Sequence, residues 1–274
     1  MLGIGSALHV QTSTGLIYRE LSELANYADL DVHFDFSRLP ETVPVNTHGE
    51  PLDPSTTVIT NLATGGTPAN HNITSVTNEP SIDHTSMIRA SVTFDSADEI
   101  LHMANDYETS GKAFTFFIVI QRTSVDNDYA ITSQEAASNA PHDFIRLTNS
   151  GGAIQLGLND ETSVTCTTSS TAGSTTSYTV VANVPTVYVI RRQASGNVFI
   201  YADKGIHIAT KSNAAIQAGA NFRFGNLGGT AEGSIADFEG TIGEVGIYDT
   251  TLTADNCIEL GTQLSRKWGV DKSS

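Results

Sequence analysis

The sequence predicts an all-β protein, a sandwich or barrel of short strands that ends in a single helix. Three observations support this prediction. Short stretches with strand-like alternation of apolar and polar residues recur at a spacing of roughly 8–12 residues. Gly, Asn and Asp mark turns between these stretches, and helical spacing of apolar residues occurs only near the two ends of the chain.

The composition limits the number of domains and the kinds of partner that this protein can have. The chain of 274 residues is long enough for one large β-domain or two small ones. Its formal net charge of −16 disfavours nucleic acid and anionic lipid as partners. The N-terminal sequence has neither a signal peptide nor a transmembrane segment, so we expect synthesis in the cytoplasm and no membrane partner. Cys166 and Cys257 lie far apart and lack a metal or redox spacing, which predicts free thiols.

The first 28 residues are predicted to form an N-terminal arm (1–15) and a short helix or turn (17–28). An extended arm presents four apolar side chains on one face, namely Leu2, Ile4, Leu8 and Val10. This surface is too small to offset the entropy of ordering the arm, at roughly 1–2 kcal/mol for each residue. We therefore expect the arm to dock onto a neighbouring subunit, either another copy or a different protein. The alternative is that it folds back onto its own domain.

Residues 29–274 are predicted to form one domain. Its first strand alternates Val32, Phe34 and Phe36 with Asp31, His33 and Asp35, which predicts a buried and a solvated face. The uninterrupted apolar run in 113–122 predicts a central strand covered on both faces. Further strands are expected at 57–60, 71–76, 87–95, 128–133, 143–148, 153–158, 162–167, 177–182, 186–193, 197–204, 206–210, 221–226 and 242–249.

Two loops predict hairpins, NSGG at 149–152 and ASGN at 194–197. In the second hairpin we expect Val187, Val189 and Arg191 to share a face with Val198 and Ile200. Arg191 and Arg192 place a cation on each face of this strand, and both are expected to pair with the acidic excess.

The last helix has clear boundaries in the sequence. Thr253 is a good N-cap, Asp255 suits the positive end of the helix dipole, and Gly269 suits the C-terminal position beyond the last turn. An apolar stripe follows the helical period, made of Cys257, Leu260, Gly261, Leu264 and Trp268. We expect this stripe to pack the helix against the β-domain.

The C-terminal region resembles the signature of concanavalin A-like, laminin-G-type jelly rolls. The matching residues are Gly240, Ile242, Glu244, Tyr248, Leu252, Thr253, Lys267, Trp268 and Gly269. Segments 30–39, 91–103, 113–122 and 187–204 are similar to upstream strands of that family in the same order. The resemblance spans about residues 29–270 and implies a sandwich of two antiparallel sheets.

The arm, together with a lone domain of this kind, resembles structural proteins of tailed phages, especially marine and cyanobacterial ones. The resemblance implies a non-enzymatic virion component, such as a capsid decoration or cement protein exposing a lectin-like domain. Its partners would be capsid or other virion proteins, copies of itself, or a glycan. The alternatives are a tail-associated adhesin that binds host polysaccharide, a cellular lectin and a carbohydrate-active hydrolase.

The sequence offers no catalytic constellation. Retaining glycosidases need two carboxyls roughly 5 Å apart, but Glu239 and Glu244 are five positions apart and point to opposite faces of a regular strand. Glu244 is expected to pair with a backbone amide or a cation. No cofactor is expected, although Asp126, Asn127 and Asp128 form a cluster of oxygen ligands suited to Ca²⁺ or simply to a turn.

Overall fold

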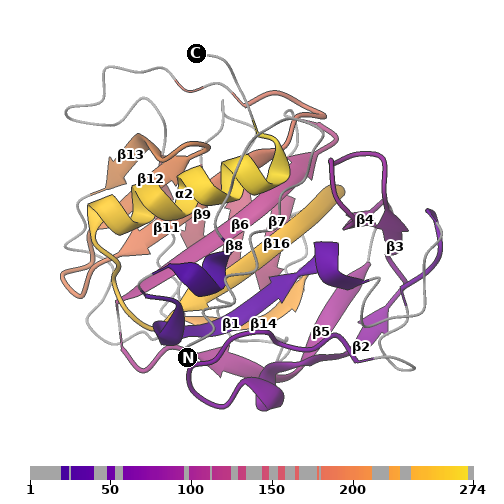
Figure 1. Cartoon of the computed structure of the whole chain (residues 1–274), viewed down its shortest axis with the longest axis horizontal. Helices are drawn as coiled ribbons and strands as arrows, with labels where there is room; N and C mark the ends of the chain where they lie inside the picture. The colour runs from indigo at the N-terminus through magenta and orange to yellow at the C-terminus, as the bar shows by residue number, and fades with distance from the viewer. Residues whose placement is uncertain are drawn as a thin grey trace, which may run out of the picture.

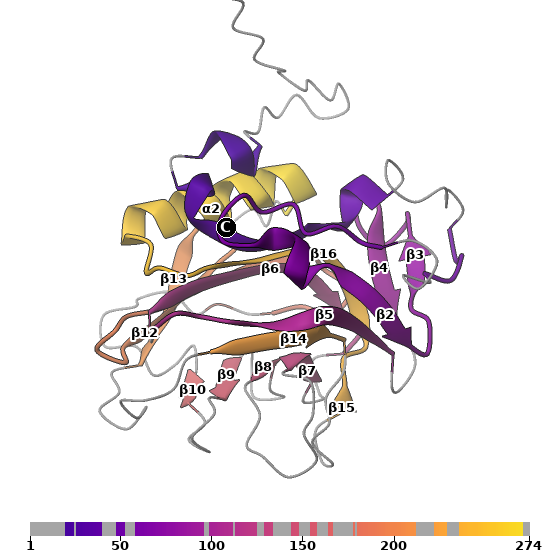
Figure 2. The same cartoon turned by 90° about the horizontal axis from the view of Figure 1, so that it is seen from below.

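The computed structural model describes residues 20–24, 26–39, 48–52, 58–95, 99–111, 113–124, 129–133, 144–147, 154–157, 164–166, 178, 180–211, 222–228 and 236–270. These residues form two sheets and one long helix, as predicted (Figures 1 and 2). Every strand pairing is antiparallel except the short contact of β15 with β7. The fold is therefore a two-sheet jelly-roll sandwich.

The first sheet has the strand order β13-β12-β11-β6-β16-β4-β3, with β1 added beside β16. Its strands are β1 (Leu30–Asp35), β3 (Ser81–Asp83), β4 (Ser91–Phe94), β6 (Phe114–Arg122), β11 (Thr186–Arg192), β12 (Val198–Ala202), β13 (Ile206–Lys211) and β16 (Gly240–Tyr248).

The second sheet has the order β10-β9-β8-β7-β14-β5-β2, with β15 beside β7. Its strands are β2 (Ile73–Thr77), β5 (Ile100–Glu108), β7 (Tyr129–Ser133), β8 (Phe144–Leu147), β9 (Ile154–Gly157), β10 (Val164–Cys166), β14 (Arg223–Leu227) and β15 (Ala236–Asp237).

Strand β6 shows why the apolar run of 113–122 is uninterrupted. It lies between β11 and β16, and both of its faces are covered. Phe116 and Ile118 pack into the core between the two sheets. Phe117 and Val119 pack into a second core beneath the terminal helix. The prediction of a central strand covered on both faces is confirmed.

The terminal helix, α2 (Ala254–Trp268), lies across the outer face of the first sheet (Figure 1). The hydroxyl of Thr253 accepts a 3.2 Å hydrogen bond from the Asn256 amide, and Gly269 closes the helix in the left-handed conformation at φ +64°. The predicted caps are thus both present. The stripe of Cys257, Leu260, Leu264 and Trp268 packs against the sheet.

The segment before β1 lies with α2 on the outer face of the first sheet. It contains two 3-10 turns, η1 (Leu21–Glu23) and η2 (Tyr27–Asp29). Leu21 is buried in the core beneath α2. Further short 3-10 turns are η3 (Phe36–Arg38) and η4 (Pro68–His71). The first sheet is therefore covered by α2 and by the chain that leads into β1 (Figure 2).

The register of the β11–β12 hairpin differs from the expected one. Ile190 pairs with Ile200 and Arg192 pairs with Val198, so Val198 and Ile200 face the same side as Arg192 and not as Arg191. The reason is the turn. Gln193 donates to Asn197, leaving three residues in the loop, and Gly196 takes φ +88°, a geometry typical of three-residue hairpins.

Candidate functional site

The residues of the C-terminal signature form the junction between β16 and α2. Ile242 fills the core between the sheets, whereas Tyr248, Leu252 and Trp268 lie in the core beneath the helix. Gly243, beside them, leaves room for the Trp268 ring, since a Cβ there would lie 2.7 Å from it. Gly240 permits a similarly close approach, because a Cβ would lie 2.3 Å from the Gln121 carbonyl oxygen. The signature is therefore a packing motif.

Glu244 lies at the centre of a buried group of polar side chains, which we call the buried ion cluster: His33, Asp35, Glu244, Lys267 and Trp268. The Lys267 ammonium donates to Asp35 at 2.6 Å and to Glu244 at 2.8 Å. The Trp268 indole donates to Glu244 at 2.7 Å, and His33 Nε2 lies 2.8 Å from its other oxygen. The cluster joins β1, β16 and α2, and it confirms the expectation that Glu244 pairs with a cation.

The protonation of the cluster follows from these contacts. Burial alone would raise the pKa of Glu244, but the Lys267 ammonium and the His33 contact outweigh it and hold that pKa below its usual range. Burial alone would lower the pKa of Lys267, but the two carboxylates raise it. Glu244 and Lys267 are therefore ionised at neutral pH.

The prediction of a solvated face on β1 is wrong for His33 and Asp35. Their exposed fractions are 5% and 7%. The alternation itself is present, but the last turn of α2 brings Lys267 onto this face and covers it. In the sequence, Lys267 stands out only as part of the C-terminal signature. The sequence Lys-Trp-Gly was the available signal for its inward direction.

The buried ion cluster is enclosed and offers no access to a substrate. Glu244 has no exposed surface, whereas Glu239 is exposed at the start of β16. The only two carboxyls of the cluster, Asp35 and Glu244, share the Lys267 ammonium. This arrangement holds the helix to the sheet, because a buried charge that loses its partner is strongly unfavourable.

The outer face of the second sheet is covered differently and its exposure is uneven: Ser75 is exposed, whereas Asn226 is only 6% exposed. No helix among the described elements covers it, whereas α2 covers the first sheet (Figure 2). On β5, Leu101 and Met103 point into the core, so His102 points outward. We give the name polar face to six described side chains on this side of the sheet: Ser75, His102, Glu108, Arg146, Arg223 and Asn226.

The polar face is internally ordered. Ser75, His102 and Asn226 are directly paired neighbours on β2, β5 and β14. His102 Nδ1 lies 3.0 Å from the side-chain oxygen of Asn226, which orients both groups. Arg223 and Glu108 form an ion pair at 3.1 Å across the same two strands. Hydroxyl, imidazole and amide groups therefore lie side by side, and the ion pair lies further along the same two strands.

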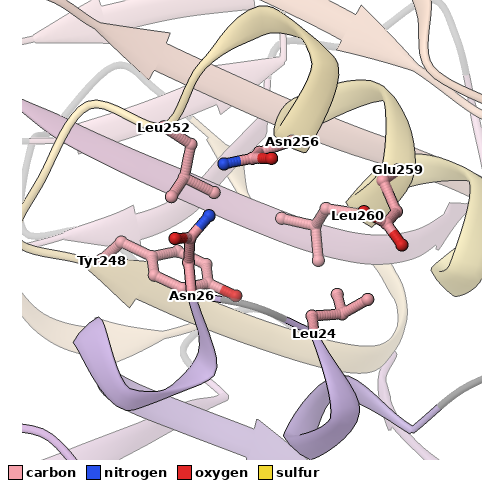
Figure 3. A pocket seen from close by; sticks show the side chains of 7 residues that line it. All are labelled: Leu24, Asn26, Tyr248, Leu252, Asn256, Glu259 and Leu260. Atoms are coloured by element: carbon pink, nitrogen blue, oxygen red, sulfur yellow. The ribbon is translucent and has the colours of Figure 1, made fainter.

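A small pocket lies between α2 and the segment before β1 (Figure 3). Its apolar walls are Leu24, Tyr248, Leu252 and Leu260, and its polar lining is Asn26, Asn256 and Glu259. It has room for about one water molecule. The pocket is therefore too small for a sugar ring.

Several predicted site residues lie outside the described residues. These are Leu2, Ile4, Leu8 and Val10 of the arm, and Asp126, Asn127 and Asp128 of the candidate calcium site. Within the described ranges, no group of three or more His, Cys, Asp or Glu side chains is arranged to hold a metal ion. The described part of the chain also contains no helix with the length and apolar character needed to cross a bilayer.

No family model matches the sequence, and no curated protein matches it. Solved structures do. Domain 4 of AbnA, an extracellular arabinanase of Geobacillus stearothermophilus in complex with arabinotriose, is 16% identical with a TM-score of 0.53. The match covers 85% of this chain and 98% of that one. At this identity the likeness shows the fold alone.

Two further structures are more distant. The carbohydrate-binding domain (CBM40) of a Ruminococcus gnavus sialidase, bound to α2,3-sialyllactose, is 17% identical with a TM-score of 0.44, over 62% of this chain and 95% of that one. The binding domain of botulinum neurotoxin serotype D is 14% identical with a TM-score of 0.48, over 68% of this chain and 44% of that one.

Proposed function

We propose that this protein is a non-catalytic domain that binds a glycan through the polar face of its second sheet. The observation that carries the proposal is the paired row of Ser75, His102 and Asn226 on a sheet face that no described helix covers. Sugars present closely spaced hydroxyl groups, each of which both donates and accepts hydrogen bonds. A row of hydroxyl, imidazole and amide groups matches this pattern.

The order within the polar face favours binding. The His102–Asn226 contact and the Arg223–Glu108 ion pair hold these side chains in place before a ligand arrives. Side chains that are already ordered lose less conformational entropy on binding than free ones do. The likeness to the arabinanase domain, which was solved with arabinotriose, supports the same role by analogy of fold.

The absence of catalysis is part of the proposal. Hydrolysis of a glycosidic bond requires two carboxyls that both reach the substrate. Asp35 and Glu244 are near neighbours but are buried and neutralised by Lys267. Glu108 of the polar face is paired with Arg223. Incubation with laminarin, agarose, alginate and peptidoglycan is expected to release no reducing ends, and turnover that Glu244→Gln abolishes would overturn this part.

A glycan array followed by calorimetry tests the binding site. The wild type should bind at least one oligosaccharide, and His102→Ala and Asn226→Ala should each weaken that binding at least tenfold. His84→Ala is the matched control, since His84 is exposed on the turn that follows β3 of the first sheet. Binding that survives both polar-face substitutions, or an array without a single ligand, would refute the proposal.

The finer hypothesis makes the domain a decoration protein of a tailed-phage capsid, with a tail adhesin as the alternative. It depends on the sequence resemblance and on the apolar arm residues, which are expected to anchor the domain to a shell protein or another copy. Deleting residues 2–15 should leave the melting temperature unchanged and abolish incorporation into particles. The copy number in purified virions separates the two roles, since hundreds indicate the shell and a few tens or fewer the tail.

A further inference from the structure

A second polar and aromatic surface lies on the first sheet, on the strands beyond the helix. We call it the rim patch: Arg191 on β11, Phe199 and Tyr201 on β12, and His207 and Thr210 on β13. Arg191 pairs with Phe199, Phe199 with Thr210, and Tyr201 with His207, so the five side chains form adjacent rows on the outer face. Figure 1 shows β13 at the edge of the sheet, beyond α2.

Three rings pack together there, of which Phe199 and His207 are partly exposed and Tyr201 is buried. The centroid of the His207 ring is 5.2 Å from that of Tyr201 and 6.2 Å from that of Phe199. His207 Nε2 lies 2.8 Å from the Thr210 hydroxyl and 3.0 Å from the Ala209 carbonyl oxygen, which fixes the imidazole. Phe199 and His207 are both partly exposed, so a ligand can reach their rings from the outer face of the first sheet.

Arg191 is held on this surface by an aromatic ring. Its guanidinium carbon lies 4.9 Å from the centroid of the Phe199 ring. Its hydrogen bond and charge act to lower the pKa of Tyr201, although burial, the larger effect, raises that pKa overall. No carboxylate of the described residues forms an ion pair with it, and its enclosed Nε lacks a hydrogen-bond partner there. The expected pairing of Arg191 with the acidic excess is therefore not seen among the described residues.

This arrangement is unusual in a chain with a net charge of −16. The guanidinium fork presents donors in a geometry that matches a carboxylate through two parallel hydrogen bonds. Stacking on Phe199 orients the fork in advance. The adjoining rings supply an apolar surface against which the C–H face of a sugar packs. The patch thus combines a carboxylate site and a sugar-ring site.

We propose that the rim patch binds a carboxylate-bearing sugar, a uronic or sialic acid residue of an acidic glycan. Arg191 pairs with the carboxylate, and the Phe199 and His207 rings contact the sugar ring. The inference rests on the proposed glycan binding but concerns a different face of the molecule, so the domain would contact neutral sugars with the second sheet and acidic sugars with the first.

The patch is tested by titrating the full chain with two pairs of ligands. The first pair is tetragalacturonic acid and its fully methyl-esterified form, and the second is 3′-sialyllactose and lactose. The free acids should bind at least tenfold more tightly than their uncharged counterparts. Arg191→Lys keeps the charge but loses the guanidinium fork, so it should weaken the affinity for the acids at least tenfold. Arg266→Lys on the exposed side of α2 is the matched control.

A measurement on the wild-type protein keeps the test valid if the Arg191 variant fails to fold. Ring signals of Tyr201 and His207 in the wild-type protein should shift with galacturonate and stay unchanged with the methyl ester. Equal binding of the acid and its ester, unshifted ring signals, or equal affinity for a sulfated oligosaccharide would each overturn the proposal. If His102→Ala abolishes neutral binding and the acids show no preference, only the rim patch fails. If no glycan binds at all, the proposed function fails as well.

Discussion

The indole nitrogen of Trp268 donates a 2.7 Å hydrogen bond to Oε2 of Glu244, and the same oxygen accepts from Lys267 at 2.8 Å. All three groups are buried where the last turn of α2 meets the centre of the first sheet. The contact explains why a Glu on a strand and a Lys-Trp pair more than twenty positions later occur together in the sequence. The helix is held by ionic contacts as well as by apolar packing.

The first prediction concerns removal of the cation. Lys267→Met keeps the aliphatic volume but leaves Asp35 and Glu244 as neighbouring buried carboxylates. Breaking a buried pair in this way is expected to cost about 3–5 kcal/mol of unfolding free energy. Denaturant titration measures the loss. Arg266→Met, one position earlier and exposed, should change stability by less than about 0.5 kcal/mol, and equal effects of the two substitutions would contradict the structure.

The second prediction concerns acid. The pKa of Glu244 is lower in the folded protein than its ordinary value of 4.5, because Lys267 and His33 outweigh the effect of burial. A lowered folded pKa contributes stability above the unfolded pKa, and that stability is lost as the pH falls through the folded pKa. Stability should therefore decline below about pH 4.5.

The Lys267→Met variant provides the control for this pH dependence. Without the ammonium, burial dominates and should raise the pKa of Glu244 above that of the unfolded chain. The contribution of Glu244 then changes sign, so the difference in unfolding free energy between wild type and variant should shrink as the pH falls. A constant difference from pH 7 to pH 3 would show that these charges are not coupled.

The third prediction concerns the close approach of strand and helix. In Gly243→Ala the new Cβ would lie 2.7 Å from the Trp268 ring, inside normal contact distance. Overpacking of this kind costs about 1–3 kcal/mol. Thermal unfolding should show a lower melting temperature and, because Trp268 is the single tryptophan, a changed emission maximum in the folded state. Gly111→Ala, where nothing lies within 4 Å of the new Cβ, should be close to neutral.

The fourth prediction concerns the Cys257 thiol. The side chain is fully buried beneath α2, and burial raises its pKa to about 12. The reactive thiolate is therefore almost absent at neutral pH. In a Cys166→Ser background, the disulfide reagent DTNB should not label the native protein within an hour but should label it rapidly in denaturant. Fast labelling of the native protein would mean that α2 detaches from the sheet.

The local elements could be predicted because short-range physics determines them. The cap at Thr253, the stripe of α2 and the end at Gly269 depend on residues within one or two helical turns. The burial of β6 on both faces follows from an apolar run that neither alternates nor breaks. The two-sheet fold follows from many such strands with turn residues between them.

The functional surfaces depend on contacts that no local pattern encodes. Alternation placed His33 and Asp35 on the outward face of β1, but whether water or Lys267 covers that face depends on a segment 232 positions away. In the same way, the three-residue turn at Gly196 decided which face of the hairpin receives Val198 and Ile200. A strand sequence specifies two faces by its period of two. Only the packing of distant segments decides which face is buried, which side chains share it and which remain available to a ligand.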